Sequence, residues 1–264
     1  VTTDISLPGS LLVLVPNANF IGISRKIFDK YEKRRLRRIV KEFKPEVVFH
    51  LGAQASVLVS YDESIETFSS NIMGTANILE ACKHMPSVQA VVIVTTDKCY
   101  ENREDREYGY RENDRLGGHD PYSASKACSE LVTASYRKSF IGTNKSDELK
   151  GPLIASARAG NVIGGGDWAV DRIVPDCMKS WSKNKKAVIR NPQSTRPWQH
   201  VLEAVGGYLL FAVNIKKNKK LHGEAFNFGP NNTKNYDVMF LVKHMRKYWK
   251  KVTWKIDKKN KSFF

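Results

Sequence analysis

Residues 90–98 read Ala-Val-Val-Ile-Val-Thr-Thr-Asp-Lys, a run of mostly β-branched apolar side chains that ends abruptly in polar groups. A strand buried on both faces of a parallel sheet has this continuous apolar pattern rather than an alternating one. Ligands of open α/β sheets bind at the carboxyl ends of such strands. The segment therefore predicts a central parallel strand whose polar end, from Thr95 onward, borders a ligand site.

The flanking segments predict the other parts of an α/β unit. Apolar side chains at helical spacing predict helices over residues 29–43 and 63–84, and a short apolar strand at 47–51 lies between them. Another apolar run predicts a strand at 153–158. Strand, helix and strand in this order indicate a Rossmann-like, doubly wound parallel sheet. On the second helix one apolar stripe is expected, made of Ile65, Phe68, Ile72 and Leu79.

Composition indicates a soluble globular protein, with 41% hydrophobic and 10% aromatic residues in 264. No apolar run approaches the ~18 residues of a membrane span, so we expect no membrane association. The net charge of +16 would suit an anionic partner, and much of it lies in residues 234–264. No nucleic-acid motif accompanies this charge, and we therefore interpret it as a solvated surface and expect no nucleic-acid partner.

Four cysteines, Cys82, Cys99, Cys128 and Cys177, are widely separated and form no C-x-x-C pair. This spacing predicts reduced thiols in or near the core, and it predicts no metal site. The amino end lacks a basic segment before its apolar run, which argues against a secretory signal. Together these features favour a cytoplasmic protein.

Tyr122 and Lys126 open a predicted helix in residues 120–126, which read Asp-Pro-Tyr-Ser-Ala-Ser-Lys. Side chains four apart lie on one helix face, and an ammonium beside a phenol lowers the phenol pKa from its usual ~10. Such a tyrosine can take a proton from a sugar hydroxyl while a nicotinamide accepts the hydride. Taken alone, this pair is more often a packed tyrosine and a solvated lysine. Its place after the polar strand end at 95–98 favours the catalytic interpretation.

Five segments resemble the extended short-chain dehydrogenase/reductase superfamily in order and spacing, namely residues 50–54, 71–75, 95–102, 122–126 and 158–162. Within that superfamily the chain is most similar to the CDP-glucose 4,6-dehydratases over roughly residues 28–230. The similarity lies in residues 97–102, 109–122, 164–168 and 196–201. Lys98 stands where dTDP-glucose 4,6-dehydratases have a glutamate.

The resemblance implies conversion of CDP-glucose, or a related nucleotide sugar, to a 4-keto-6-deoxy sugar with bound NAD. Tyr122 would take the proton of the C4 hydroxyl, with Lys126 stabilising its phenolate and Thr96 bonding the same hydroxyl. Lys98 would remove the C5 proton, and Asp97 would protonate the departing C6 hydroxyl.

The resemblance also implies binding residues and an assembly. Residues 1–160 would bind NAD, and residues 161–264, interleaved with them, would mainly bind the nucleotide sugar. A homodimer would form through the helix that bears Tyr122 and the long helix before it. Substrate would contact Asn161, Arg196 and His200. NAD would contact Gly9, Ser10, Asp29, Ala53, Gln54, Asn71, Thr95, Tyr122 and Lys126. His50 is interpreted as a core residue rather than a base.

The amino end departs from the family pattern. A G-x-x-G-x-x-G loop is expected before the first helix, yet this chain keeps only Gly9 and Ser10 there and adds Asp4 and Pro8. Asp29 is interpreted as a remnant of the adenine-side acidic segment. Two alternatives therefore stay open: a catalytically silent nucleotide-sugar-binding relative, and another superfamily enzyme such as a dTDP-glucose 4,6-dehydratase or a 4-epimerase.

Overall fold

The computed structural model of the protein describes residues 11–15, 19–23, 33–103, 109–142, 150–169, 171–231 and 236–257. The chain divides into two compact units. Unit 1 comprises Val1–Ala159 and Val205–Phe228, and unit 2 comprises Gly160–Ala204 and Gly229–Phe264. The chain therefore contributes two separate stretches to each unit.

Unit 1 is built on one six-stranded sheet with the order β10-β5-β4-β3-β1-β2. Strands β3, β4, β5 and β10 run parallel to one another, as the apolar runs predict. The strand β4 is buried along almost its whole length, and the prediction of a Rossmann-like parallel sheet is confirmed. The strands are β1 (Leu11–Val15), β2 (Asn19–Ile23), β3 (Val47–His50), β4 (Ala90–Thr96), β5 (Leu153–Ala159) and β10 (Ala225–Phe228).

Strand β1 is an exception to the parallel arrangement. It pairs antiparallel with both of its neighbours, β2 and β3. Only residues 16–18 connect β1 to β2. A connection this short can close a hairpin, whereas neighbouring parallel strands need a crossover of a dozen or more residues. Strand β1 is therefore an antiparallel addition to a sheet whose other described strands β3, β4, β5 and β10 are parallel.

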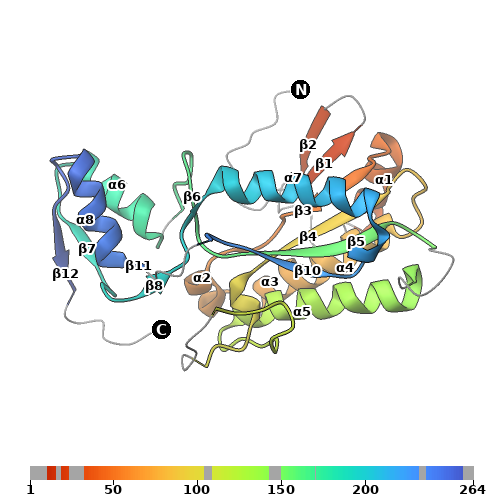
Figure 1. Ribbon diagram of the computed structural model, residues 1–264, viewed down its shortest axis with the longest axis horizontal. Coiled ribbons are helices and arrows are strands. Elements are labelled where there is room, and N and C mark those ends of the chain that lie inside the picture. Colours follow the sequence, from red (N-terminus) through yellow and green to blue (C-terminus); the bar gives the residue numbers. More distant parts are fainter. Residues whose placement is uncertain are drawn as a thin grey trace. The chain divides into compact units, whose positions relative to one another are not determined.

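Helices cover both faces of this sheet, with α7 on one side and α5 on the other (Figure 1). On the α5 side, Leu36 and Val40 of α1 join Leu79, Ile93 and Ile154 in one buried core. This core holds α1, α4, β4 and β5 together, and its residues come from apolar stripes visible in the sequence. The helices are α1 (Lys33–Phe43), α2 (Val57–Asp62), α3 (Ser64–Phe68), α4 (Gly74–Cys82), α5 (Pro121–Tyr136) and α7 (Val201–Lys217).

The helix predicted over residues 63–84 is interrupted. A π-helical turn, Ser69–Met73, separates α3 from α4. Such a turn contains an extra residue, so the apolar face that precedes it is rotated away from the face that follows. Leu79 is accordingly buried, but Ile65 is 79% exposed. The prediction that Ile65 shares the buried stripe is wrong for this reason.

Unit 2 has its own core around Trp181, whose indole Nε1 donates to the Thr253 carbonyl oxygen at 2.7 Å. The helices α6 (Ile173–Ser182) and α8 (Val238–Tyr248) pack with short strand pairs. Two pairs are parallel, β6 (Val162–Ile163) with β9 (Gln199–His200) and β7 (Ala187–Ile189) with β12 (Trp254–Ile256); one is antiparallel, β8 (Thr195–Arg196) with β11 (Tyr236–Asp237).

The predicted state of the cysteines is confirmed. All four are free thiols; Cys82, Cys99 and Cys177 are buried and Cys128 is half-buried. Within the described ranges, no cluster of three or more histidine, cysteine or acidic side chains is arranged to hold a metal ion. The helices of the described part of the chain are too short or too polar to span a bilayer.

Candidate active site

The carboxyl end of β4 carries three of the predicted catalytic residues. Thr96 caps a 3-10 turn, Asp97–Cys99, and its hydroxyl accepts from the Lys98 backbone N–H at 3.4 Å. The same hydroxyl donates to Asp97 Oδ1 at 3.0 Å. Thr96 is buried, whereas Asp97 and Lys98 are half-buried. The sequence prediction that these side chains meet at a strand end is therefore matched by the structure.

Helix α5 starts where the sequence predicts. Asp120 is its N-cap: Oδ1 accepts from the Ser123 N–H at 2.9 Å, and Oδ2 accepts from the Ser123 hydroxyl at 2.6 Å. Pro121 occupies the first turn, where its missing N–H costs nothing. The backbone N–H of Tyr122 donates to the Ser60 hydroxyl at 3.2 Å. Tyr122 is buried, and its backbone is fixed both by the capped first turn of α5 and by this hydrogen bond to α2.

Lys126 lies one helical turn after Tyr122 and is only 7% exposed. Its ammonium donates to the Val94 carbonyl oxygen of β4 at 3.3 Å. Burial lowers the pKa of Lys126 to about 8, while the charge of Glu130 and then Cys99 act in the opposite direction. At neutral pH the ammonium is therefore mainly protonated, and a positive charge lies on the helix face that carries the Tyr122 phenol.

His50 ends the neighbouring strand β3. Its Nε2 lies 3.2 Å from the Thr75 hydroxyl, and the side chain is 2% exposed. Burial and, secondly, the nearby Lys126 charge lower the pKa of His50 to about 3. The imidazole is therefore neutral at physiological pH, which fits a buried structural residue rather than a proton acceptor.

Asn71 joins the loop after β3 to the first turn of α5. Its side chain accepts from the Gln54 N–H at 2.7 Å and donates to the Gln54 carbonyl at 3.0 Å and to the Ser125 hydroxyl at 2.7 Å. Ser125 in turn donates to the Tyr122 carbonyl oxygen at 2.7 Å. Asn71 lies in the π-helical turn, a feature that is frequent at functional sites. The structure thus places Gln54 and Asn71, which sequence analysis assigns to the cofactor, beside the helix of Tyr122.

Thr95 and Ala53 are the other described cofactor candidates. Ala53 is 5% exposed in the loop after β3, and Thr95 is 6% exposed near the end of β4. Strands β3 and β4 are parallel neighbours, so their carboxyl ends meet at one sheet edge. The remaining candidates, Gly9, Ser10 and Asp29, lie outside the described residues.

The proposed substrate residues all belong to unit 2. The Asn161 carbonyl oxygen accepts from the Gln199 N–H at 3.0 Å, and pairing of β6 with β9 sets His200 opposite Ile163. Arg196 lies in β8, and its guanidinium donates to the Thr195 carbonyl oxygen at 2.7 Å. Asn161 and His200 are thereby brought near one another, and Arg196 lies shortly before His200 in the chain.

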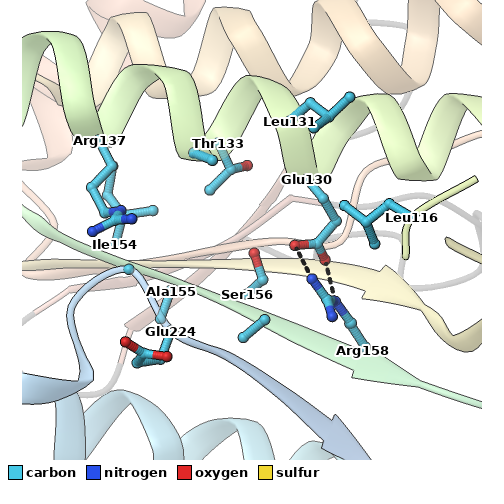
Figure 2. A pocket seen from close by; sticks show the side chains of 13 residues that line it. Leu116, Glu130, Leu131, Thr133, Arg137, Ile154, Ala155, Ser156, Arg158 and Glu224 are labelled. Carbon is cyan, nitrogen blue, oxygen red and sulfur yellow. Dashed lines mark hydrogen bonds and ion pairs between the residues drawn. The ribbon is translucent and has the colours of Figure 1, made fainter. Parts of the chain in front are cut away.

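One buried charged cluster of unit 1 was not predicted from the sequence. Glu130 of α5 and Arg158 of β5 form an ion pair, and both residues are buried (Figure 2). Glu130 also accepts a hydrogen bond from Thr95, and Arg158 donates to the Tyr100 hydroxyl at 2.9 Å. The sequence indicated only that Glu130 lies two helical turns after Tyr122. It did not indicate the ion pair, because Arg158 is 28 residues away.

Comparison with known proteins places this arrangement in a family. The sequence model of the family described as GDP-mannose 4,6 dehydratase matches residues 25–262. The CDP-glucose 4,6-dehydratase of Salmonella typhimurium is 47% identical over 235 residues, which are 89% of this chain and 65% of that protein. The chain thus spans slightly less than two thirds of that relative's length.

Solved structures show the same fold. The UDP-glucuronic acid 4-epimerase of Bacillus cereus, in complex with UDP-glucuronic acid and NAD, superposes with a TM-score of 0.72 and is 21% identical over 89% of this chain and 67% of its own. A dTDP-glucose 4,6-dehydratase double mutant from Streptomyces venezuelae, with NAD bound, gives a TM-score of 0.69 and 21% identity, over 89% of this chain and 66% of its own.

Proposed function

The chain belongs to the GDP-mannose 4,6 dehydratase family, within the extended short-chain dehydrogenase/reductase superfamily, and from this premise we propose that it is an NAD-dependent CDP-glucose 4,6-dehydratase. The product would be CDP-4-keto-6-deoxyglucose. The choice of CDP-glucose is supported by the 47% identity with the Salmonella typhimurium enzyme. The single observation that carries the chemistry is the position of buried Lys126 one helical turn after buried Tyr122, on a helix beside the Thr96–Asp97–Lys98 strand end.

The residues at the sheet edge fit a bound dinucleotide. A lysine ammonium has three protons, and among the described residues one acceptor is assigned to it, the Val94 carbonyl oxygen. Ribose hydroxyls are suitable further acceptors. Lys126 and Tyr122 would therefore hold the nicotinamide ribose, with Ala53, Gln54, Asn71 and Thr95 along the edge. When bound, NAD would accept the hydride from C4 of the sugar and return it to C6.

The first step removes the C4 hydroxyl proton. Tyr122 is the base, because the neighbouring Lys126 ammonium stabilises its phenolate form. Thr96 would hydrogen-bond the same sugar hydroxyl and orient it. Both Tyr122 and Lys126 are buried, and charges interact more strongly in a buried site than in water.

The second step eliminates water across C5 and C6. A C4 ketone makes the C5 proton acidic, and Lys98 in its neutral form would remove it. Asp97 would give a proton to the departing C6 hydroxyl. The hydrogen bond from Thr96 orients the Asp97 carboxyl on the same turn as Lys98, so one short segment supplies both groups. A 4-epimerase needs neither group, which favours dehydration.

The nucleotide would be bound by unit 2. Arg196 is the proposed phosphate ligand, because its guanidinium matches a diphosphate in charge and geometry. Asn161, directly before β6, and His200, in the neighbouring strand β9, would contact the rest of the nucleotide sugar. Residues 1–160 would thus bind mainly NAD, and residues 161–264 mainly the substrate.

The test is turnover of CDP-glucose by purified protein, with and without added NAD, followed through the base-induced absorbance of the 4-keto product. We expect product from wild type and at least a hundredfold loss in Tyr122→Phe, since general-base catalysis contributes about that much. Tyr61→Phe, at a half-exposed tyrosine of α2, is the matched control. If the purified protein carries no NAD and forms no product when NAD is added, it is a catalytically silent relative. If it turns over dTDP-glucose but not CDP-glucose, the proposed substrate is wrong and the protein is a dTDP-glucose 4,6-dehydratase.

We also propose a homodimer through α5 and the helices before it. Large apolar side chains of this region are exposed, including Ile65 (79%), Met73 (53%) and Leu131 (59%). Exposed apolar groups of this number mark an interaction surface. Leu131→Asp should convert dimer to monomer in light scattering, whereas Leu210→Asp on α7, at a leucine exposed to a similar extent, should not. A monomeric wild type would refute the dimer.

A further inference from the structure

Glu130 and Arg158 form a bidentate ion pair between α5 and β5. Arg158 Nε donates to Glu130 Oε1 at 3.1 Å, and Nη2 donates to Oε2 at 3.0 Å. Figure 2 shows the two side chains pointing toward each other from helix and sheet. Both residues line a pocket with a volume of about 130 Å³. Two parallel hydrogen bonds fix both the distance and the orientation of the helix relative to the strand.

The pair also bonds to the strand and the segment on which the proposed catalytic groups lie. Thr95, directly before Thr96, donates to Glu130, and it is the register partner of Arg158 across β4 and β5. Arg158 Nη1 donates to the Tyr100 hydroxyl at 2.9 Å and to the Glu112 carbonyl oxygen at 2.8 Å. Tyr100 directly follows the 3-10 turn of Asp97 and Lys98. One ion pair therefore ties both ends of this catalytic segment to α5.

Glu130 lies on the same helix face as Lys126, one turn further on. The titratable groups near Lys126 are Tyr122 and Glu130 on its own helix, Cys99 on the turn after β4, and His50 at the end of β3. His50 is neutral and Cys99 is a buried thiol whose pKa is raised to about 12. Glu130 is the carboxylate of this set, and it forms the ion pair with Arg158.

We propose that Glu130 is a positioning residue for the dehydratase reaction: with Arg158 it locks the helix of Tyr122 and Lys126 to the turn of Asp97 and Lys98, and its negative charge supports the Lys126 ammonium. The inference rests on the proposed function of that site. Stability alone gives little reason for the pair, because apolar side chains of similar volume stabilise a core as well as a buried ion pair does. The hydrogen bonds of the pair to Thr95 and Tyr100 instead fix the position of the catalytic segment relative to α5.

The charge effect is tested by titrating Lys126 with lysine-selective ¹³C NMR, using Lys126→Met to assign the signal. In Glu130→Gln the titration midpoint should fall by roughly one pH unit, the effect of losing one nearby opposite charge. Glu80→Gln is the matched control, since Glu80 of α4 also forms an ion pair, with Lys83 at 2.7 Å. An unchanged midpoint in Glu130→Gln overturns the electrostatic part. This measurement requires no turnover.

The positioning effect is tested by the pH profile of CDP-glucose turnover. In Glu130→Gln we expect kcat to fall at least tenfold and the alkaline limit to move to lower pH, because Lys126 loses its proton earlier. Tyr100→Phe keeps every charge but removes the hydroxyl that links Arg158 to the turn. It should lower kcat without moving the pH limits. If Glu130→Gln has the same kcat as wild type and the same acid and alkaline limits of the pH profile, the inference is wrong. The proposed function is not affected by that result.

A folding defect can be separated from these effects. Glu130→Gln leaves the Arg158 cation buried without its carboxylate, so the double variant Glu130→Gln with Arg158→Gln removes both charges. If the single variant does not fold, the double variant should fold and still show the lowered Lys126 midpoint and reduced kcat. A folded double variant with wild-type values contradicts the inference. If wild type turns over no sugar nucleotide, the proposed function is wrong. The comparison of the Lys126 titration midpoint between wild type and Glu130→Gln then tests the effect of Glu130 on Lys126 by itself.

Discussion

Burial changes the chemistry of single side chains next to the end of β4. The pKa of Lys126 falls from 10.5 to about 8, mainly through burial. Between these two pH values the unfolded chain binds more protons at this site than the folded chain, so the free energy of unfolding rises with pH. Below about pH 8 both states are protonated and the folded state carries the full cost of the buried ammonium. This cost is about 3 kcal/mol, from 1.36 kcal/mol per pH unit.

Lys126→Met should therefore stabilise the fold while abolishing turnover. Methionine is unbranched like lysine and one atom shorter, and it removes the charge, so we expect a gain of up to about 3 kcal/mol at pH 7. The gain should shrink as pH rises from 8 toward 10.5, because wild type loses its penalty there. Urea unfolding at pH 7 and pH 10 measures both values. A gain that stays constant across this range would show that the ammonium is not the cause.

Helix α5 owes its start to a few local interactions. Asp120 caps it, Pro121 fixes its first turn, and Tyr122 and Lys126 follow at positions determined by that start. Any fraying of the first turn moves the Tyr122 phenol, whereas the same fraying of another helix leaves the site intact. The capping residue therefore has both a stability effect and a positional effect, and the two can be separated.

Asp120→Ala should cost about 1 kcal/mol of stability, the usual effect of losing an N-cap, and should also lower kcat. Asp237→Ala is the matched control, because Asp237 caps α8 by accepting from the Phe240 N–H at 2.6 Å. It should cost a similar amount of stability with much less loss of kcat. Denaturant unfolding and CDP-glucose turnover of both variants check this. Equal losses of kcat would contradict a special role for the start of α5.

Gly223 allows the chain to enter β10 beside α5. Its φ is +84°, and a Cβ there would lie 2.3 Å from the guanidinium carbon of Arg137. Gly166 has a similar φ of +82° with nothing within 4 Å. Both alanine variants carry the left-handed penalty of about 1–2 kcal/mol, and Gly223→Ala should cost roughly 1 kcal/mol more for displacing Arg137. Thermal unfolding of both variants measures the difference; equal costs would mean that Arg137 moves aside freely.

Each of the two units of the molecule has a hydrophobic core built from its own stretches of the chain. The core of unit 1 surrounds β4, and the core of unit 2 surrounds Trp181. Because each core is assembled from its own elements, a cavity in one removes packing from that unit first. The division also separates the proposed chemistry, with proton transfer in unit 1 and nucleotide recognition in unit 2.

Trp181→Ala should destabilise unit 2 by about 3–5 kcal/mol, since the indole is fully buried. Hydrogen exchange followed by mass spectrometry should show faster exchange mainly in residues 171–200 and 236–257. Phe49→Ala, at a phenylalanine of β3 that is 2% exposed, is the matched control and should act on unit 1. Identical exchange patterns for the two variants would show that the units unfold as one.

Local patterns in the sequence were sufficient for much of this protein. The apolar run of β4, the Asp-Pro start of α5, the Tyr122–Lys126 spacing and the polar end at Thr96, Asp97 and Lys98 were all predictable, because strand burial, helix caps and side-chain period depend on near neighbours. The antiparallel β1, the π-helical turn that exposes Ile65, and the bond of Asn71 to Ser125 were not. Only the tertiary structure brought Glu130 to Arg158, since a contact across 28 residues depends on how α5 packs on β5, and no local period encodes that register.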